Sequence, residues 1–360
     1  MTPALRAAVE KYLIDPSQEG AWQALAFVDL DACDNAAGMG SPPLASVDLD
    51  GCGSTARMGL PPLVFIDLDV CDRSALAGSL PPFPVIGIGD PDHPLSVTLD
   101  AVLESPVDAE ALIKQVERAP RAAAVTVQLL RTAEALPLDR ALVLESLAYG
   151  LLQGSEEYAA WLSARRPAEP NPDGRVVVER RDAVLHVTLD RPRARNAINR
   201  VVRDQLYEAF TVAAADPEIR SVKLRSVGEA FSAGGDLEEF GTTRDPATAH
   251  LIRMHTLPAL AVARRPEILD VHIQGACIGA GVEISAFAGR VTAASTAWFQ
   301  LPELAMGLIP GAGGCVSVPR RIGRQRAALM ILSGQRIDAQ TALRWGLIDA
   351  IEDQPPVTTI

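Results

Sequence analysis

The chain has 360 residues, of which 48% are apolar and 22% are charged. This balance is typical of a globular chain with a hydrophobic core, and it excludes a chain that is disordered throughout. The length favours two domains, or one large domain with an extension. No apolar run reaches the roughly 18–20 residues of a membrane span, and Glu10 and Lys11 interrupt the place of a signal peptide. We therefore expect a cytoplasmic protein without a membrane partner.

The charge is divided unevenly between the two halves of the chain. In total, 33 Lys and Arg residues stand against 45 Asp and Glu residues, a net charge of −12. Residues 1–174 hold 11 basic and 25 acidic side chains, net −14, whereas residues 175–360 hold 22 and 20, net +2. Neither half has the basic surface that nucleic acid requires, so no such partner is expected. The five cysteines are read as reduced thiols.

An N-terminal helix is expected in residues 1–22, and an acidic repeat follows in residues 23–83. The repeat is Asp-Leu-Asp-x-Cys, which recurs every 19 residues, ending at Cys33, Cys52 and Cys71. Strands of about five residues cannot bury a face alone, so the units either stack or stay mobile. Alternate Asp residues could present two carboxylates to a metal. Without a calcium-loop pattern, solvated repeat edges are favoured and no metal site is predicted.

An α/β-helical segment is predicted for residues 84–168. The expected elements are strands at Pro84–Asp90 and Ala122–Leu130, a helix at 108–118, and two helices within 138–164. Three prolines and a glycine then occur in Pro167–Gly174, where no helix can continue. We place the domain boundary there, with a linker at 169–174 and a second domain at 175–360.

Strands and helices alternate in residues 175–360, which implies crossover connections and a largely parallel sheet. Strands are expected at 176–179, 184–189, 222–226 and 269–273, and helices at 197–215, 246–263 and 281–289. The fold class predicted for this half is therefore α/β.

Two Gly-rich turns carry the chemistry expected of this half, Gly228–Asp236 and Gly275–Glu283. Glycines let the main chain approach a ligand with its N–H groups pointing outward, so two such turns could form an oxyanion hole. Glu283 lies in the first turn of the following helix, and Glu303 supplies a second carboxylate in an apolar setting. Two carboxylates beside an oxyanion hole suit the addition of water across a polarised double bond.

Six motifs follow one another in this half: Leu189-Asp-Arg-Pro with Asn196-Ala197, Ala230-Phe-Ser-Ala-Gly-Gly-Asp236, Gln274-Gly-Ala-Cys-Ile-Gly-Ala-Gly-Val-Glu283, Leu301-Pro-Glu303, Gly307-Leu-Ile-Pro-Gly311 and Leu332-Ser-Gly-Gln-Arg336. In this order and spacing, the segment from about Val176 to Ile351 resembles the crotonase superfamily, also called the enoyl-CoA hydratase/isomerase family. The resemblance implies a spiral of ββα units.

The resemblance also implies an acyl-CoA substrate, whose thioester carbonyl lies between the backbone N–H groups of Gly235 and Ala280. Glu283 and Glu303 match the two catalytic carboxylates of the hydratases. Arg193 and Arg195 fall where the family binds the CoA nucleotide. The remaining residues expected to contact substrate are Ala233, Asp236, Pro310 and Gly311. No cofactor is expected beyond the coenzyme A of the substrate, and the family implies a homo-oligomer, either a trimer or a hexamer.

Three features depart from the family pattern. Ala280 stands where hydratases usually have glycine, the chain ends soon after Gly346–Ile351, and the front 170 residues have no usual counterpart. Residues 141–162 loosely resemble the helical C-terminal tail of crotonases. Residues 105–168 could therefore pack on the 175–351 core in place of that tail, and an unrelated amphipathic hairpin is an equal alternative.

These observations favour an enoyl-CoA hydratase-like lyase. Within the enzymes, the alternatives are isomerisation, dehydration or another transformation of a specialised acyl-CoA. Outside them, the alternative is a non-catalytic module that binds acyl-CoA or protein through the acidic repeats. The presence of two matched carboxylates disfavours the non-catalytic alternative.

Overall fold

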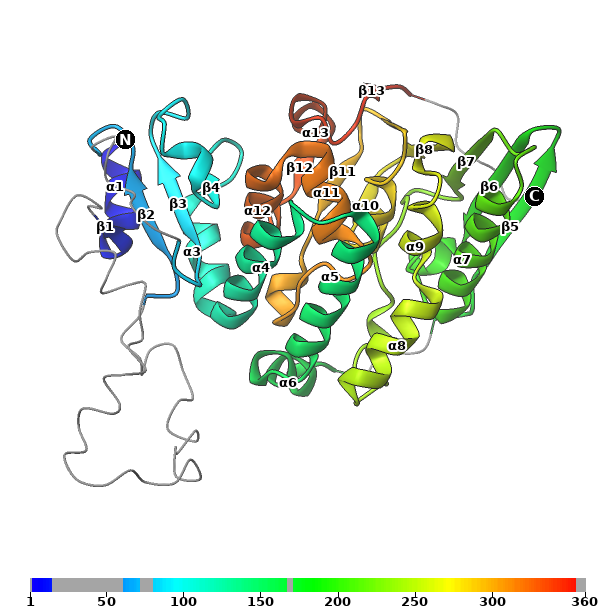
Figure 1. The fold of residues 1–360 in the computed structure, drawn as a ribbon, viewed down its shortest axis with the longest axis horizontal. Helices are drawn as coiled ribbons and strands as arrows, with labels where there is room; N and C mark the ends of the chain where they lie inside the picture. Colours follow the sequence, from blue (N-terminus) through cyan, green and yellow to red (C-terminus); the bar gives the residue numbers. More distant parts are fainter. Residues whose placement is uncertain (1, 15–60, 72–79, 167–170, 354–360) are drawn as a thin grey trace.

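Two α/β regions lie side by side along the long axis of the molecule (Figure 1). The computed structural model describes residues 2–14, 61–71, 80–166 and 171–353. The first two acidic repeats, part of the expected N-terminal helix and residues 169–170 of the expected linker lie outside these ranges.

The strands of the second half form a six-stranded and a three-stranded sheet. The larger has the order β13-β10-β8-β7-β6-β5, in which only β5 and β6 are antiparallel. Its strands are β5 (Arg175–Arg181), β6 (Val184–Asp190), β7 (Ser221–Ser226), β8 (Leu269–Ile273), β10 (Arg290–Ala293) and β13 (Ala350–Ile351). The smaller has the order β12-β11-β9, with β9 (Ala276–Ile278), β11 (Trp298–Gln300) and β12 (Ile337–Asp338).

The chain alternates between these sheets, since β8 leads to β9 and β10 leads to β11. Isolated bridges from Ile198 to Gly235 and from Ser232 to Cys277 continue the smaller sheet into the preceding turns of the chain. Successive turns therefore stack as a spiral, and equivalent positions of neighbouring turns lie side by side. The predicted α/β fold class is confirmed.

The helices of this half are α7 (Arg200–Ala215), α8 (Pro246–Thr256), α9 (Pro258–Val262), α10 (Ala280–Ser285), α11 (Gly314–Ile322), α12 (Arg324–Ser333) and α13 (Ala339–Trp345). The single helix expected at 246–263 is wrong, because Pro258 cannot continue a helix and starts a new one. The helix expected at 281–289 ends at Ser285. The helix expected from Ala197 starts at Arg200, because the Asn199 side chain caps it by accepting the Val202 N–H.

The front half contains a second, four-stranded parallel sheet of order β1-β2-β3-β4. Its strands are β1 (Leu13–Ile14), β2 (Val64–Asp67), β3 (Val85–Ile88) and β4 (Ala101–Val102). The expected solvated edge is wrong for the third repeat, since β2 lies between β1 and β3 and is buried throughout. Phe65 packs into one apolar cluster and Ile66 into another, so both faces of β2 are covered. The N-terminal helix is short: α1 (Pro3–Val9) gives way to β1.

Four helices connect this sheet to the second half: α3 (Ala109–Arg118), α4 (Pro120–Ala133), α5 (Leu138–Gln153) and α6 (Glu156–Ala164). The strand expected at Ala122–Leu130 is wrong. Pro120 starts a helix there, and the buried residues Ala123, Val127 and Leu130 repeat at helical spacing. A short buried apolar run has the same appearance in a helix and in a strand, so its periodicity did not separate the two.

These helices pack on the second half, where α4 and α5 contact α11, α3 and α4 contact α12, and α5 contacts α8 (Figure 1). Buried Val127, Leu142 and Leu152 belong to the same hydrophobic cluster as the core of residues 175–351. No helix in the described ranges combines the length and the apolar character that a membrane crossing requires.

Candidate active site

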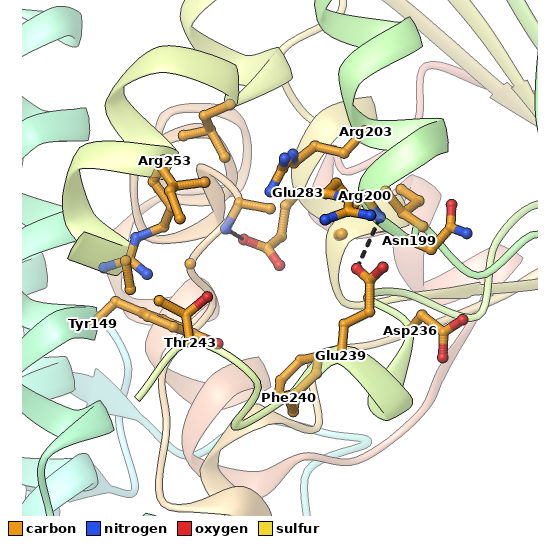
Figure 2. A pocket seen from close by; sticks show the side chains of 18 of the residues that line it. Tyr149, Asn199, Arg200, Arg203, Asp236, Glu239, Phe240, Thr243, Arg253 and Glu283 are labelled. Atoms are coloured by element: carbon orange, nitrogen blue, oxygen red, sulfur yellow. Dashed lines mark hydrogen bonds between the residues drawn. The ribbon is translucent and has the colours of Figure 1, made fainter. Parts of the chain in front are cut away.

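A cavity of about 240 Å³ lies where the two Gly-rich turns meet α5 and α8 (Figure 2). All four residues predicted to be catalytic line it: Gly235, Ala280, Glu283 and Glu303. The spiral explains why they meet, because they follow equivalent strands in three successive turns. The two Gly-rich turns touch directly, since a Cβ at Gly234 would lie 3.0 Å from the Ile278 carbonyl oxygen.

Two backbone N–H groups on the cavity wall, those of Gly235 and Ala280, donate to no described residue. Ala280 is the first residue of α10, where the N–H groups of a helix have no partner within the helix. The preceding Gly279 has φ 48° and ψ −120°, a conformation that side chains rarely adopt. The wall therefore holds two unused donors suited to a carbonyl oxygen that gains negative charge.

Glu283 lies in the first turn of α10 and is only 2% exposed. Its Oε2 accepts the N–H groups of Ala312 at 2.6 Å and of Gly314 at 2.9 Å. Burial raises its pKa to about 7, although these two N–H groups act in the opposite direction. Glu283 is therefore able to take up or release a proton near neutral pH.

Glu303 follows β11 and is 8% exposed. Its Oε2 is buried and has no hydrogen-bond partner among the described residues. Burial, and then the charge of Glu283, raise the pKa of Glu303 well above its usual range. A Cβ at position 279 would lie 2.5 Å from Glu303 Oε1, so glycine is needed there for this close approach. The environment favours the protonated form of Glu303.

Asp236 lines the cavity, and its side chain is engaged in holding the first turn together. Its Oδ2 lies 2.6 Å from Nη1 of Arg191, and both side chains are buried. Asn196 adds to this frame by donating to the carbonyl oxygens of Val227 and Ala230. The motif residues around Arg191 and Asn196 thus fix the loop that presents Gly235.

Gly311 also lines the cavity, whereas the other four predicted substrate contacts do not. Arg193 and Arg195 are exposed, and the Arg195 carbonyl accepts the Ala233 N–H at 2.9 Å. Pro310 is buried, with its ring close to Gly314. Contacts of these four residues with substrate stay a prediction.

Several cavity residues were not identified from the sequence, namely Tyr149, Arg200, Arg203, Phe240 and Arg253. Tyr149 and Arg253 form one wall, with the guanidinium 4.7 Å from the ring centre (Figure 2). No local signal identified Tyr149, because its place in the cavity depends on the packing of α5 against α8.

No group of three or more His, Cys, Asp or Glu side chains suited to a metal occurs in the described ranges. In the third repeat, Oδ1 of Asp67 accepts the Asp69 N–H and Oδ1 of Asp69 accepts the Asp90 N–H. These carboxylates therefore accept local backbone N–H groups.

An α/β spiral with two free amides and two buried carboxylates on one cavity defines a class of protein able to polarise a carbonyl group and move protons beside it. Residues 179–358 match the family model described as enoyl-CoA hydratase/isomerase. The chain belongs to this family, and the predicted membership of the crotonase superfamily is confirmed.

Relatives of the chain are named as a hydratase and a dehydratase of CoA compounds. The chain is 36% identical over 176 residues to the 2,3-dehydroadipyl-CoA hydratase of Escherichia coli, covering 49% of this chain and 68% of the relative. It is 31% identical over 183 residues to the carnitinyl-CoA dehydratase of Citrobacter koseri, covering 49% and 67%. The crystal structure of an enoyl-CoA hydratase from Thermoplasma volcanium matches at 32% identity with a TM-score of 0.45, covering 50% of this chain and 72% of that chain. The predicted hydratase-like enzyme class is confirmed by the family model and by the relatives named as hydratases.

Proposed function

We propose that the protein adds water to the double bond of a 2-enoyl-CoA thioester. One observation carries this proposal, namely that two unused N–H groups and two buried carboxylates of different character line one cavity. The N–H groups of Gly235 and Ala280 would hold the thioester oxygen, which gains negative charge as water attacks C3.

The two carboxylates would divide the proton transfers between them. Glu283, whose Oε2 accepts two N–H groups, is suited to the ionised form and would take a proton from water. Glu303, whose buried Oε2 has no partner in the described part of the chain, is suited to the protonated form and would give a proton to C2. The water oxygen bonds to C3. Glu283 then releases its new proton to solvent, and Glu303 takes one up again.

Coenzyme A would enter as part of the substrate, with no separate cofactor. Arg200 and Arg203 line the cavity and are candidates to contact its anionic groups (Figure 2). Arg193 and Arg195, exposed outside the cavity wall, stay candidates for its nucleotide. A homo-oligomer, trimer or hexamer, stays a prediction that light scattering after gel filtration would test.

The test is a spectrophotometric assay of the purified protein with crotonyl-CoA and with an aryl-enoyl-CoA. We expect loss of the absorbance of the conjugated enoyl thioester as water adds. A protein that leaves both substrates unchanged would contradict hydration. Conversion of a 3-enoyl-CoA into the conjugated 2-enoyl-CoA, without hydration, would instead support isomerisation, which requires one carboxyl group to carry a proton between C4 and C2.

A further inference from the structure

A third carboxylate, Glu145, lies next to the cavity and comes from the front half of the chain. It is on α5 and is 0% exposed. Its Oε1 accepts the Gly313 N–H at 2.7 Å, and its Oε2 accepts the Cys315 N–H at 2.8 Å. Both oxygens therefore accept hydrogen bonds from the turn that begins α11.

The same turn holds Glu283, and the two carboxylates take its N–H groups alternately. Ala312 and Gly314 donate to Glu283, while Gly313 and Cys315 donate to Glu145. Four consecutive N–H groups at a helix start, which have no partners within the helix, are therefore all satisfied. Neither carboxylate alone satisfies all four N–H groups.

The turn has little freedom to adopt another conformation. Gly313 has φ 107°, and a Cβ there would lie 2.6 Å from the Phe287 ring. A Cβ at Gly314 would lie 2.6 Å from Cγ of Glu283. The backbone thus lies tightly between the two carboxylates, and a shift of one side of the turn moves the donors of the other.

The position of Glu145 is itself fixed by contacts between α5 and α8. Arg253 on α8 donates through Nε to the Ser146 hydroxyl at 2.9 Å and through Nη2 to the Ser146 carbonyl at 3.0 Å. The titratable groups that act on Glu145 are Glu283 from α10 and Arg253 from α8. Burial, and then the charge of Glu145, raise the pKa of the Cys315 thiol on α11. No ion pair within 4.0 Å neutralises Glu145 among the described residues.

We propose that Glu145 is a positioning residue: by holding the N–H groups of Gly313 and Cys315, it keeps those of Ala312 and Gly314 directed at Glu283 Oε2 and so directs Glu283 Oε1 into the cavity. Its action goes through Glu283 and needs no contact with substrate. The role rests on the proposed function of Glu283 and assigns to the front half a part in the chemistry of the second half.

The test compares Glu145→Gln, Glu283→Gln and the double variant in the full chain. A glutamine keeps the shape of Glu145 but has one acceptor oxygen, so one N–H of the turn loses its partner. We expect kcat for crotonyl-CoA to fall about 10–100-fold in Glu145→Gln, with binding of the unreactive butyryl-CoA changed less than about twofold. Asp139→Asn is the matched control, since it removes an exposed carboxylate from the same helix and should leave kcat unchanged.

Coupling is the decisive readout. If Glu145 acts through Glu283, the double variant should be no slower than Glu283→Gln alone, because residues in one network are not additive. Losses that multiply, or a Glu145→Gln variant with the kcat of the wild type, would overturn the proposal. If Glu145→Gln does not fold, Glu145→Asp, which retracts the carboxylate by one methylene, takes its place with the same expectation. Failure of both to fold would assign Glu145 a structural role and also overturn it.

A second readout does not depend on turnover. Carbon-13 NMR of protein labelled at the glutamate carboxyl carbon, assigned with Glu283→Gln, follows the titration of Glu283 directly. The N–H groups of Ala312 and Gly314 lower the pKa of Glu283, so their loosening in Glu145→Gln should move this titration to higher pH by about half a unit or more. An unchanged titration would overturn the proposal. A wild-type protein that does not hydrate crotonyl-CoA would overturn the proposed function instead, and this titration would still test the coupling.

Discussion

Buried carboxylates occur in both α/β regions, and the two active-site glutamates of the second region differ from Asp100 of the front region in their surroundings. In the front region, Asp100 is 1% exposed and lies 2.6 Å from Nη2 of Arg131, with the Val85 N–H on the same oxygen. In the second region, Glu283 and Glu303 are also buried, and no cation lies within 4.0 Å of them among the described residues.

The difference separates a structural carboxylate from a reactive one. A buried charge with a cation at hydrogen-bond distance is stabilised in one ionisation state, which suits a role in packing. A buried carboxylate without a cation has a raised pKa, and that of Glu283 is raised to about 7, so Glu283 can exchange protons near neutral pH. Glu145 lies in the front region of the sequence. Its environment resembles that of Glu283 and Glu303, because it is buried and has no ion pair within 4.0 Å among the described residues.

The largest effect is expected from separating the two regions. Residues 171–360 expressed alone would expose the faces of α11 and α12 and leave the N–H groups of Gly313 and Cys315 without Glu145. Each buried leucine lost from this contact, such as Leu142 or Leu152, is worth roughly 1.5–3 kcal/mol. We expect loss of cooperative unfolding, measured by circular dichroism, whereas the full chain should retain it. A soluble, cooperative and equally active 171–360 fragment would show that the regions are independent.

Within the second region, Glu283→Gln and Glu303→Gln should each reduce kcat by about 10²–10⁴, the usual contribution of general acid–base catalysis. The side-chain shape is kept, so circular dichroism spectra should match the wild type. Hydration at the wild-type rate in both variants would remove the two glutamates from the mechanism.

Gly235→Pro should reduce kcat/KM by about 10²–10³, because it removes one of the two oxyanion donors, worth about 2.7–4 kcal/mol. Gly235→Ala is the matched control: it keeps the N–H and places a Cβ 3.1 Å from the Phe240 ring. Both variants need a folding check by circular dichroism. Activity equal to that of Gly235→Ala in a folded proline variant would argue against this donor.

For the structural carboxylate the opposite behaviour is expected. Asp100→Asn should lower the free energy of unfolding by about 3 kcal/mol, since it leaves the partly buried Arg131 without its counter-charge. At a temperature where the variant is folded, kcat should equal that of the wild type. Urea unfolding and the hydration assay measure the two effects, and a variant with normal stability but reduced kcat would reverse the comparison.

The smallest effects concern pH. Because Glu283 must be ionised to act as the base, kcat/KM should fall about tenfold per unit below its pKa of about 7. Its folded pKa exceeds the unfolded value of about 4.3, so its contribution to stability is full below about pH 4 and is lost as pH rises to about 7. Glu283→Gln should therefore unfold at a higher temperature than the wild type at pH 8, and at a similar temperature near pH 4. Equal melting temperatures at pH 8 would contradict a buried, ionised Glu283.

The sequence alone determined the features that depend on local chemistry. The strands expected at 176–179, 184–189, 222–226 and 269–273 follow the hydrophobic period and lie within two residues of their predicted bounds. The Asn199 cap, in contrast, starts α7 three residues after the predicted start. The family motifs also identified Gly235, Ala280, Glu283 and Glu303, although the motifs do not show that these residues lie together in space. Each of these motifs is short and contiguous, so all of its information lies in neighbouring residues.

Tertiary structure decided what depends on partners distant in the chain. The run Ala122–Leu130 is a helix because α11 and α12 cover it, and β2 is buried because apolar clusters cover both of its faces. Glu145 gave no signal of its function, since its partners Gly313 and Cys315 lie 168 and 170 residues further along. Periodicity reports which face of an element is apolar, whereas the packing of other elements decides which carboxylate is buried and which N–H groups it meets.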